Sequence, residues 1–185
     1  VTEDMAASVE VYVNHIRATR QRDDVDLVEH KFDLSSVYPG CFGTADSVRW
    51  RQSEKLLIVT DYKHGMGVFV SAEDNPQLKY YGLGALLESG YPAAKIRLEI
   101  AQPRFGGADP IRSCEIDAID LIDFAGDLVV FAKATEAEDA PLVPGGHCQF
   151  CPAAGTCPAL ADKAQAIAKI EFSTGLAYDP EKLRL

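Results

Sequence analysis

Two aspartates and a lysine occur in a hydrophobic stretch of this chain, in a pattern suited to binding a metal ion. Asp46 lies in the segment CFGTADSVRW, and Asp61 and Lys63 belong to the triplet DYK that follows the apolar run LLIVT. Mg²⁺ prefers carboxylate oxygens, and once bound it polarises a phosphoryl group and activates a water molecule. Asp61 and Lys63 are two apart, so in a strand they share a face, where the ammonium group can orient that water. These residues favour metal-assisted cleavage of a phosphodiester bond.

A β-hairpin is expected to carry both aspartates. Apolar residues alternate from Phe42 to Trp50 and then run continuously from Leu56 to Val59, with the polar turn RQSEK between the two segments. Aspartate is disfavoured in strands and costly to bury alone, so a pair of them needs a cation or an equivalent partner. The alternative is a surface hairpin in which D-x-K is only a solvated ion pair, because D-x-K by itself is very common.

A helix is expected after the strand that ends at Lys63. Asn75 can cap its first turn, Pro76 suits the first helical position, and an apolar stripe follows at helical spacing. Gln77 and Tyr81 are four residues apart and share one face of this helix, where an amide and a phenol can bind a phosphate or a base near the metal. For Tyr81 the alternative is packing in the core, because this residue belongs to the apolar stripe.

Three motifs occur in an order that resembles the RecB-type branch of the PD-(D/E)XK nucleases: G-x-x-D from Gly43 to Asp46, D-x-K from Asp61 to Lys63, and Q-x-x-x-Y from Gln77 to Tyr81. In more detail, GTAD, DYKHG-x-G-V and NPQL-x-x-Y-x-LGAL are similar to segments of an uncharacterised phage- and prophage-associated family of RecB-like exonucleases. The similarity runs over nearly the whole chain.

The resemblance implies a DNA exonuclease that depends on Mg²⁺ or Mn²⁺. The residues implied for catalysis are Asp46, Asp61, Lys63, Gln77 and Tyr81, and those implied for metal binding are Asp46, Asp61 and the backbone carbonyl of Tyr62. It also implies the restriction-endonuclease-like fold, with DNA as the substrate and a phage recombinase or single-strand annealing protein as a partner, in the cytoplasm of a bacterial host. The competing functions are a non-catalytic nucleic-acid-binding or scaffold module with the same fold, and a cysteine-cluster redox or regulatory protein.

Three cysteines near the C-terminus form a second candidate site. Cys148, Cys151 and Cys157 have the spacing C-x₂-C-x₅-C in a Gly- and Pro-rich loop, which favours a thiophilic metal. The resemblance extends to this loop, because several RecB-like nucleases bind a [4Fe-4S] cluster through one cysteine before the nuclease core and three after it. The alternatives are Zn²⁺ with His147 as a further ligand, a C-x-x-C redox pair, and a metal-free loop.

The N-terminal region departs from the pattern of that family. The chain begins at Val1 and soon enters a helix, so the family's first cysteine and its first active-site motif, a His or Glu on a helix, have no counterpart. We therefore expect the chain to be a fragment. Glu10 and His15 are candidate substitutes on the first helix, although both are expected to face solvent. Cys41 and Cys114, the latter in an expected loop, are more typical of small buried residues than of a fourth ligand.

Composition limits the class of protein. The chain has 185 residues, 47% of them hydrophobic, without an apolar run of membrane-spanning length or a signal-like start. An odd number of cysteines fits a reducing cytosol. A net charge of −10 argues against a protein that coats duplex DNA. DNA binding would then depend on a local basic track, for which the candidates are Lys63, His64, Lys79 and Arg104, with Arg49 and Arg51 as further ones.

An α/β fold is expected, with a nuclease core over residues 1–140 and a cysteine-cluster region over residues 141–185 packed on it. The expected elements are a helix over 3–20, strands over 27–34, 42–50, 56–61 and 95–104, helices after Asn75, over 116–135 and over 159–172, and a tail over 173–185. Helix, three strands, helix and strand is the order of the restriction-endonuclease-like core, a mixed sheet flanked by helices.

Overall fold

The computed structural model describes residues 2–90 and 92–173, and the chain divides into two compact units, Val1–Ala134 and Thr135–Leu185. The expected division was after residue 140, so the first unit is slightly shorter than expected. From residue 174 on, the expected tail lies outside the described residues. Each unit is described by itself below.

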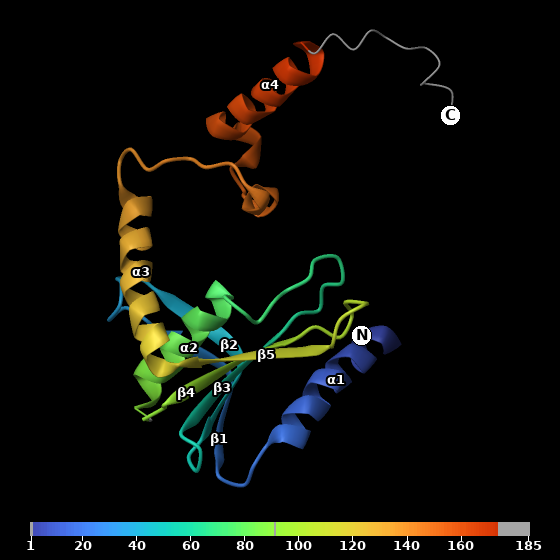
Figure 1. Ribbon diagram of the computed structural model, residues 1–185, viewed down its shortest axis with the longest axis vertical. Coiled ribbons are helices and arrows are strands. Elements are labelled where there is room, and N and C mark those ends of the chain that lie inside the picture. Colours follow the sequence, from blue (N-terminus) through green and yellow to red (C-terminus); the bar gives the residue numbers. More distant parts are fainter. Residues whose placement is uncertain (1, 91, 174–185) are drawn as a thin grey trace. The chain divides into compact units, whose positions relative to one another are not determined.

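A five-stranded mixed sheet forms the centre of the first unit (Figure 1). Its strands follow one another in the order β1 (Asp24–Asp33), β2 (Phe42–Arg51), β3 (Leu56–Tyr62), β4 (Lys95–Ala101) and β5 (Ile111–Asp117). Only the β3–β4 pair is parallel, because the helix α2 (Pro76–Ser89) crosses over between these two strands. With α1 (Glu3–Thr19) and α3 (Ala118–Glu136), this arrangement confirms the expected α/β class and matches the element order of a restriction-endonuclease-like core.

The hydrophobic core lies between the sheet and α2. The continuous apolar run of β3 is fully enclosed, as are Leu78, Leu83 and Ala85 on the inner side of α2. Close approach of the helix requires a small residue at Gly84, where an added Cβ would lie 2.8 Å from the Cβ of Phe32. Apolar burial and this close approach together hold α2 at a defined height over the sheet.

The first turn of α2 has the predicted cap. The side chain of Asn75 accepts hydrogen bonds from the backbone N–H groups of Gln77 and Leu78, and Pro76 occupies the first helical position. The helix ends at Gly90, whose φ of 64° is the left-handed conformation that glycine adopts without strain. The start of α2, and with it the position of Gln77, is therefore determined by local sequence.

Helix α1 packs on the opposite face of the sheet from α2. In β4, Leu98 lies close to Gly82 of α2, whereas the next residue, Glu99, binds the Nε2 atom of His15 in α1 at 2.9 Å. Glu99 also accepts a hydrogen bond from the Thr60 hydroxyl at 2.7 Å. His15 was expected to face solvent, and this is wrong, because its ring is the partner of a buried carboxylate.

The segment before α3 differs from the expectation. Residues 111–117 form the edge strand β5, antiparallel to β4, where the sequence had suggested that a helix begins at Ile116. Cys114 therefore lies within a strand and not in a loop, and its thiol donates to the carbonyl of Ala72 at 3.3 Å. Alternate residues of β5 are exposed, as is typical of an edge strand, but Ile116, Ile119 and Ile122 recur every three residues, close to the helical period, and this pattern obscured the boundary.

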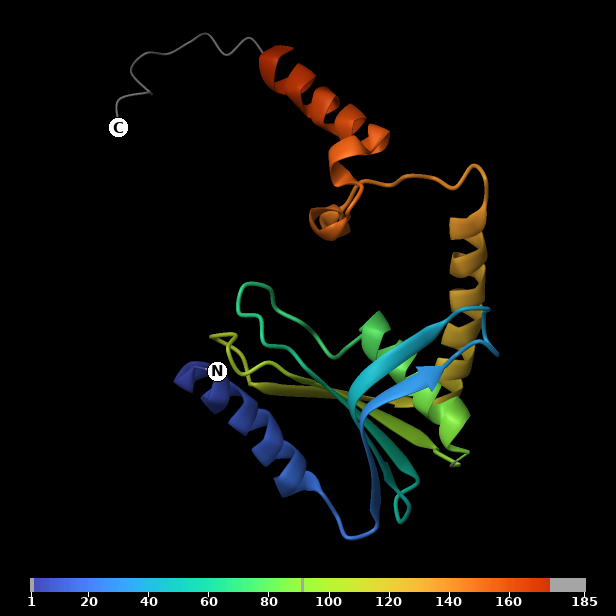
Figure 2. The same cartoon turned by 180° about the vertical axis from the view of Figure 1, so that it is seen from behind.

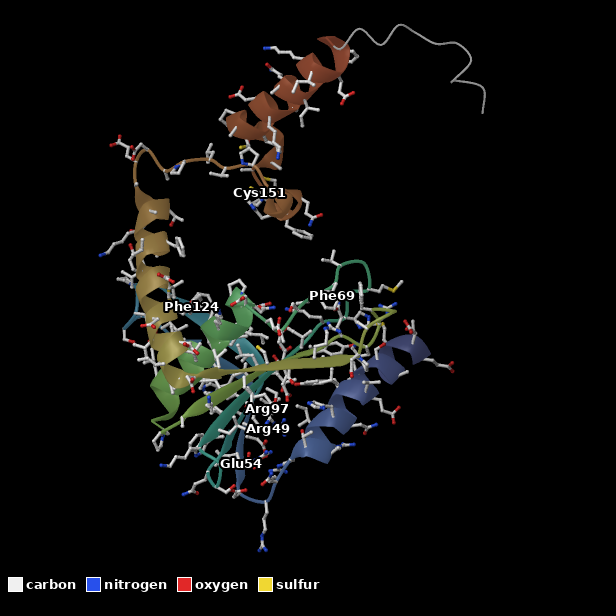
Figure 3. All side chains as sticks on the ribbon, viewed as in Figure 1. Arg49, Glu54, Phe69, Arg97, Phe124 and Cys151 are labelled. Atoms are coloured by element: carbon white, nitrogen blue, oxygen red, sulfur yellow. The ribbon has the colours of Figure 1, made fainter. Side chains whose placement is uncertain are left out.

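The second unit contains the cysteine-bearing loop and one long helix. Two short 3₁₀ turns, Gly146–Phe150 and Ala154–Thr156, precede α4 (Pro158–Ser173), which covers the helix expected over 159–172. Figure 2 shows these turns and α4 from behind, and Figure 3 labels Cys151 between the two turns. Within the part of the chain that the structure describes, every helix is too short or too polar to cross a lipid bilayer.

Candidate active site

Asp46 and Asp61 lie where β2 and β3 separate. The β2–β3 ladder runs from Arg51↔Leu56 to Ser47↔Thr60, and continuing it by one step would place Asp46 opposite Asp61. Beyond this point β3 pairs with β4 alone. The backbone N–H of Tyr62 donates to Oδ2 of Asp46 at 2.7 Å, so this carboxylate bridges the opening between the two strands.

The carboxyl group of Asp61 is almost completely enclosed, with 6% of its side chain exposed. Burial raises its pKa, the positive charge of Lys63 opposes this effect, and the negative charge of Asp46 adds to it. Nζ of Lys63 lies 2.7 Å from Oδ2 of Asp61 as an ion-pair partner, but this oxygen makes no hydrogen bond of acceptable geometry within the described residues. A buried carboxylate oxygen in this condition, next to a second carboxylate, is suited to a hard cation.

Lys63 is also held by α2. Its ammonium group donates to Oε1 of Gln77 at 2.6 Å, and Nε2 of Gln77 donates to the hydroxyl of Tyr81 at 2.8 Å. The Asn75 cap places Gln77 in the first turn of α2, one helical turn from Tyr81. Two strands and one helix thus bring the acids, the lysine, the amide and the phenol of the three sequence motifs into one continuous set of contacts.

Tyr62 connects this site to the other face of the sheet. Its side chain, between those of Asp61 and Lys63 along the strand, lies next to the ring of Tyr12 in α1, with 5.5 Å between ring centroids. Its hydroxyl lies 2.9 Å from Nδ1 of His64, and Nε2 of His64 lies 2.8 Å from Nη1 of Arg104. A guanidinium group can only donate, so Nε2 is the acceptor and Nδ1 is the donor to the phenol oxygen.

Two arginines expected to serve a basic track are buried instead. Arg51 binds the carboxylate of Asp24 at 2.9 Å, and Arg49, labelled in Figure 3, is fully enclosed between Asp24 and Glu99 at 3.9 and 3.8 Å. The expectation of a surface role is wrong for both, because the sheet register places them opposite acids. Sequence reasoning had not identified Asp24 and Glu99, although alternating charges in KIRLEIA were a signal that one face of β4 is ionic.

Glu10 and His15 do not join the two aspartates. His15 is held on the α1 face by Glu99, and Glu10 is exposed on α1. Among the described residues, no three His, Cys, Asp or Glu side chains are grouped closely enough to hold a metal ion. The expected metal site therefore rests on two carboxylates and on the backbone oxygen of Tyr62, with Glu10 and His15 excluded as a third ligand in this arrangement.

The same result applies to the three cysteines of the second unit. Cys148, Cys151 and Cys157 are all free thiols and are not brought together into a metal-binding group. Cys148 Sγ accepts the backbone N–H of Gly145 at 3.3 Å. The described arrangement does not fit a bound cluster. The [4Fe-4S] or Zn²⁺ site therefore stays a prediction, without support from this geometry.

Comparison with protein families places the chain in one of them. Residues 1–184 match the family described as "Protein of unknown function (DUF2800)", and because the match spans almost the whole chain, the protein belongs to that family. Among solved structures, one described as "Crystal structure of SSO0001" is similar, with 15% sequence identity and a TM-score of 0.40. The similarity covers 83% of this chain and 68% of that one.

Proposed function

We propose that this protein is a metal-dependent DNA exonuclease core that hydrolyses phosphodiester bonds. The observation that carries the proposal is the enclosed Oδ2 of Asp61, which lies without a hydrogen bond beside a second carboxylate and 2.7 Å from the ammonium group of Lys63. Burial raises the pKa of this carboxylate in spite of the lysine, so its charged form costs stability. A cation at this position would offset that cost and explain why the group is there.

The donor set is all oxygen, which suits Mg²⁺ or Mn²⁺. The residues that would hold the ion are Asp46, Asp61 and the carbonyl of Tyr62, and the ion would supply Lewis-acid polarisation of a phosphate and activation of a water molecule. Asp46 is kept in place by the Tyr62 N–H, and this hydrogen bond leaves its second oxygen available to a ligand.

Lys63 has the role of orienting the attacking water and offsetting the charge that develops on the phosphate. Its position is set from two sides, by the Asp61 carboxylate and by the Gln77 amide. Tyr81 in turn fixes the rotamer of Gln77 through the amide–phenol hydrogen bond. Gln77 and Tyr81 therefore act as positioning residues in the proposal, and Lys63 acts on the reacting groups.

Cleavage of end-labelled DNA with Mg²⁺ or Mn²⁺ tests the proposal. Asp61→Asn and Lys63→Ala are expected to abolish product formation while the circular dichroism spectrum stays unchanged. Asp117→Asn, on β5 in an exposed ion pair with Lys95 of β4, is the matched control and is expected to retain full activity. Cleavage by Lys63→Ala at the rate of the unmodified protein would refute the assignment.

The second candidate function is a non-catalytic nucleic-acid-binding or scaffold module. It is favoured by the absence, among the described residues, of a third acidic or histidine ligand next to Asp46 and Asp61. Calorimetric titration with Mn²⁺ distinguishes the two functions, since the scaffold predicts no Mn²⁺ binding that depends on Asp46 and Asp61. A partner recombinase or annealing protein and a location in the bacterial cytoplasm belong to the exonuclease proposal and follow from the family resemblance alone.

A further inference from the structure

We infer that two loops beside the proposed site form a platform for the unpaired bases of a DNA strand; this inference rests on the proposed function and specifies its substrate. The platform consists of residues 62–72, from the last residue of β3 into the loop before α2, and residues 102–108, in the loop between β4 and β5. Figures 1 and 2 both show the two loops side by side, beyond the ends of β3 and β4.

The first loop presents large apolar side chains to solvent. Met66 is 60% exposed, Val68 66% and Phe69 48%, and Figure 3 labels Phe69 on this loop. Phe69 packs edge-to-face against Phe105 of the second loop, with 5.4 Å between ring centroids. The guanidinium group of Arg112 lies 4.7 Å from the centroid of Phe69. An exposed aromatic ring that is supported from below is the arrangement on which a nucleobase stacks.

Buried hydrogen bonds fix the backbone of the first loop. The side chain of Gln102, which is almost fully enclosed, donates to the carbonyls of Gly65 at 2.9 Å and Val68 at 2.8 Å. Its Oε1 atom accepts from the N–H of Val70 at 3.2 Å and from Arg112 at 2.7 Å. Every polar atom of this amide side chain is therefore used to shape the loop, and its apolar residues are not free to fold inward.

The platform differs from the rest of the protein in its charged residues. The chain has a net charge of −10, and residues 62–72 and 102–108 contain no Asp or Glu, although Glu73 and Asp74 follow the first range and Asp109 follows the second. Both cations of the two ranges are already in ion pairs, Lys63 with Asp61 of the proposed site at 2.7 Å and Arg104 with Asp4 of α1 at 2.9 Å. The platform is therefore an apolar surface with two ion-paired cations, and its complement is a strand that presents unpaired bases to the exposed ring of Phe69.

The platform is continuous with the proposed site. Its first loop follows directly after Asp61, contains Lys63 near its start, and leads through residues 73–75 to the Asn75 cap that positions Gln77. A strand whose phosphate lies between Asp46 and Asp61 would have its neighbouring nucleotides over the loop. Bases paired in a duplex cannot stack on Phe69, so the inferred substrate is a single strand or a frayed end.

Binding measured separately from cleavage tests this inference. The full chain is titrated in Ca²⁺, in place of Mg²⁺, into a fluorescein-labelled single-stranded oligonucleotide and, in parallel, into the blunt duplex of the same sequence. Phe69→Ala is expected to weaken single-strand binding by about 5- to 150-fold, the range for losing one base–aromatic stack. Phe131→Ala, a substitution of a still more accessible ring on α3 (66% exposed against 48% for Phe69), is the control and is expected to bind as the unmodified protein does.

A charge change at Met66 provides a second test that does not remove an aromatic contact. Met66→Glu is expected to weaken single-strand binding and Met66→Lys to strengthen it, with unchanged thermal midpoints because this side chain is largely solvated. A 2-aminopurine base near the strand end is expected to lose fluorescence on binding to the unmodified protein and not on binding to Phe69→Ala.

The outcomes distinguish the platform from the proposed function. If Asp61→Asn loses cleavage while Phe69→Ala binds single strands normally, the platform is refuted and the nuclease stands. If single-strand binding depends on Phe69 and no cleavage occurs, the platform stands and the nuclease fails. Preference for blunt duplex over single strand refutes the platform, as does a change in sedimentation of the free protein on Phe69→Ala, which would identify the surface as a contact between copies.

Discussion

Replacing Asp61 by asparagine is expected to stabilise the protein in the absence of divalent cations. Burial raises the pKa of this carboxyl group although Lys63 is only 2.7 Å away, so the charged form costs stability in the folded state. Asparagine has the same shape without the charge. The lost ion pair counts for little, because the side chain of Lys63 is 26% exposed and such partly solvated pairs contribute about 0–1 kcal/mol.

The size of the stabilisation depends on the buried charge that is removed and the ion pair that is lost. Relief of the buried charge outweighs the lost pair, and substitutions of this kind at functional sites gain about 0.5–2 kcal/mol. For a chain of this size each kcal/mol raises Tm by about 2–4 °C, so Asp61→Asn is expected to raise Tm by about 1–8 °C at neutral pH. Differential scanning calorimetry in EDTA measures this shift.

The pH dependence has a defined sign. An acid whose folded-state pKa is raised destabilises the folded protein once pH exceeds the pKa of the unfolded state, 3.8, and this cost is complete above the folded-state pKa. The advantage of Asp61→Asn should therefore be greatest at neutral pH and shrink as pH falls toward about 4. Asp117→Asn, in an exposed pair, should show no such gain. A lower Tm for Asp61→Asn at neutral pH, or a gain independent of pH, would refute the reasoning.

Divalent cations should reverse the order of the Tm values of the unmodified protein and Asp61→Asn. A ligand at about 100 times its Kd stabilises the folded state by about 2.7 kcal/mol, provided that it does not bind the unfolded chain. Mg²⁺ or Mn²⁺ should therefore raise the Tm of the unmodified protein by about 5–11 °C and leave that of Asp61→Asn almost unchanged. Equal shifts in both proteins would show that the cation binds elsewhere.

Three further predictions concern the rest of the chain. Tyr81→Phe removes the phenol that orients the Gln77 amide next to Lys63, so in the proposed nuclease kcat should fall while KM stays constant; steady-state cleavage kinetics would contradict this if both were unchanged. Arg49→Ala leaves two buried carboxylates without their shared partner and should lower the free energy of unfolding by about 3–5 kcal/mol in urea titrations, against less than about 1 kcal/mol for Arg97→Ala in an exposed pair. If the cysteine loop closes around iron or zinc in the cell, Cys148→Ser should reduce the metal content measured by mass spectrometry and Cys41→Ser should not, whereas a metal-free native protein would end this prediction.

Several elements could be predicted because their signals are local. The Asn75–Pro76 cap, the apolar run of β3 and the polar turn before it each depend on neighbours within a few residues, and they occur where expected. The shared face of Asp61 and Lys63 follows from the two-residue period of a strand, and the shared face of Gln77 and Tyr81 follows from the helical turn. Convergence of all four then required only that α2 follow β3 closely.

Other features could not be predicted, because they depend on partners far away in the chain. His15 and Glu99 are 84 residues apart, and nothing local indicates that a histidine on a polar-looking helix binds a buried strand carboxylate. Arg49 and Arg51 have the sequence character of surface cations, but the β1–β2 register places Asp24 and Asp26 opposite them. The boundary between β5 and α3 could not be predicted either, because β5 ends at Asp117 and α3 begins at the next residue, with no turn between them.

The sequence by itself determined most of the strands and helices, though not β5 and its boundary with α3, and the spacing that makes the acids, lysine, amide and phenol a coherent set, because dihedral preference, capping and side-chain period act over a few residues. Only the tertiary structure decided that Asp46 and Asp61 lie where β2 and β3 separate and that Oδ2 of Asp61 is enclosed without a hydrogen bond. It also decided that Arg49 and Arg51 are buried in the sheet. Burial and charge pairing result from contacts among segments that are distant in the chain. Solvent exclusion, which sets the cost of the Asp61 charge that a cation would offset in the proposed site, exists only once those segments have packed together.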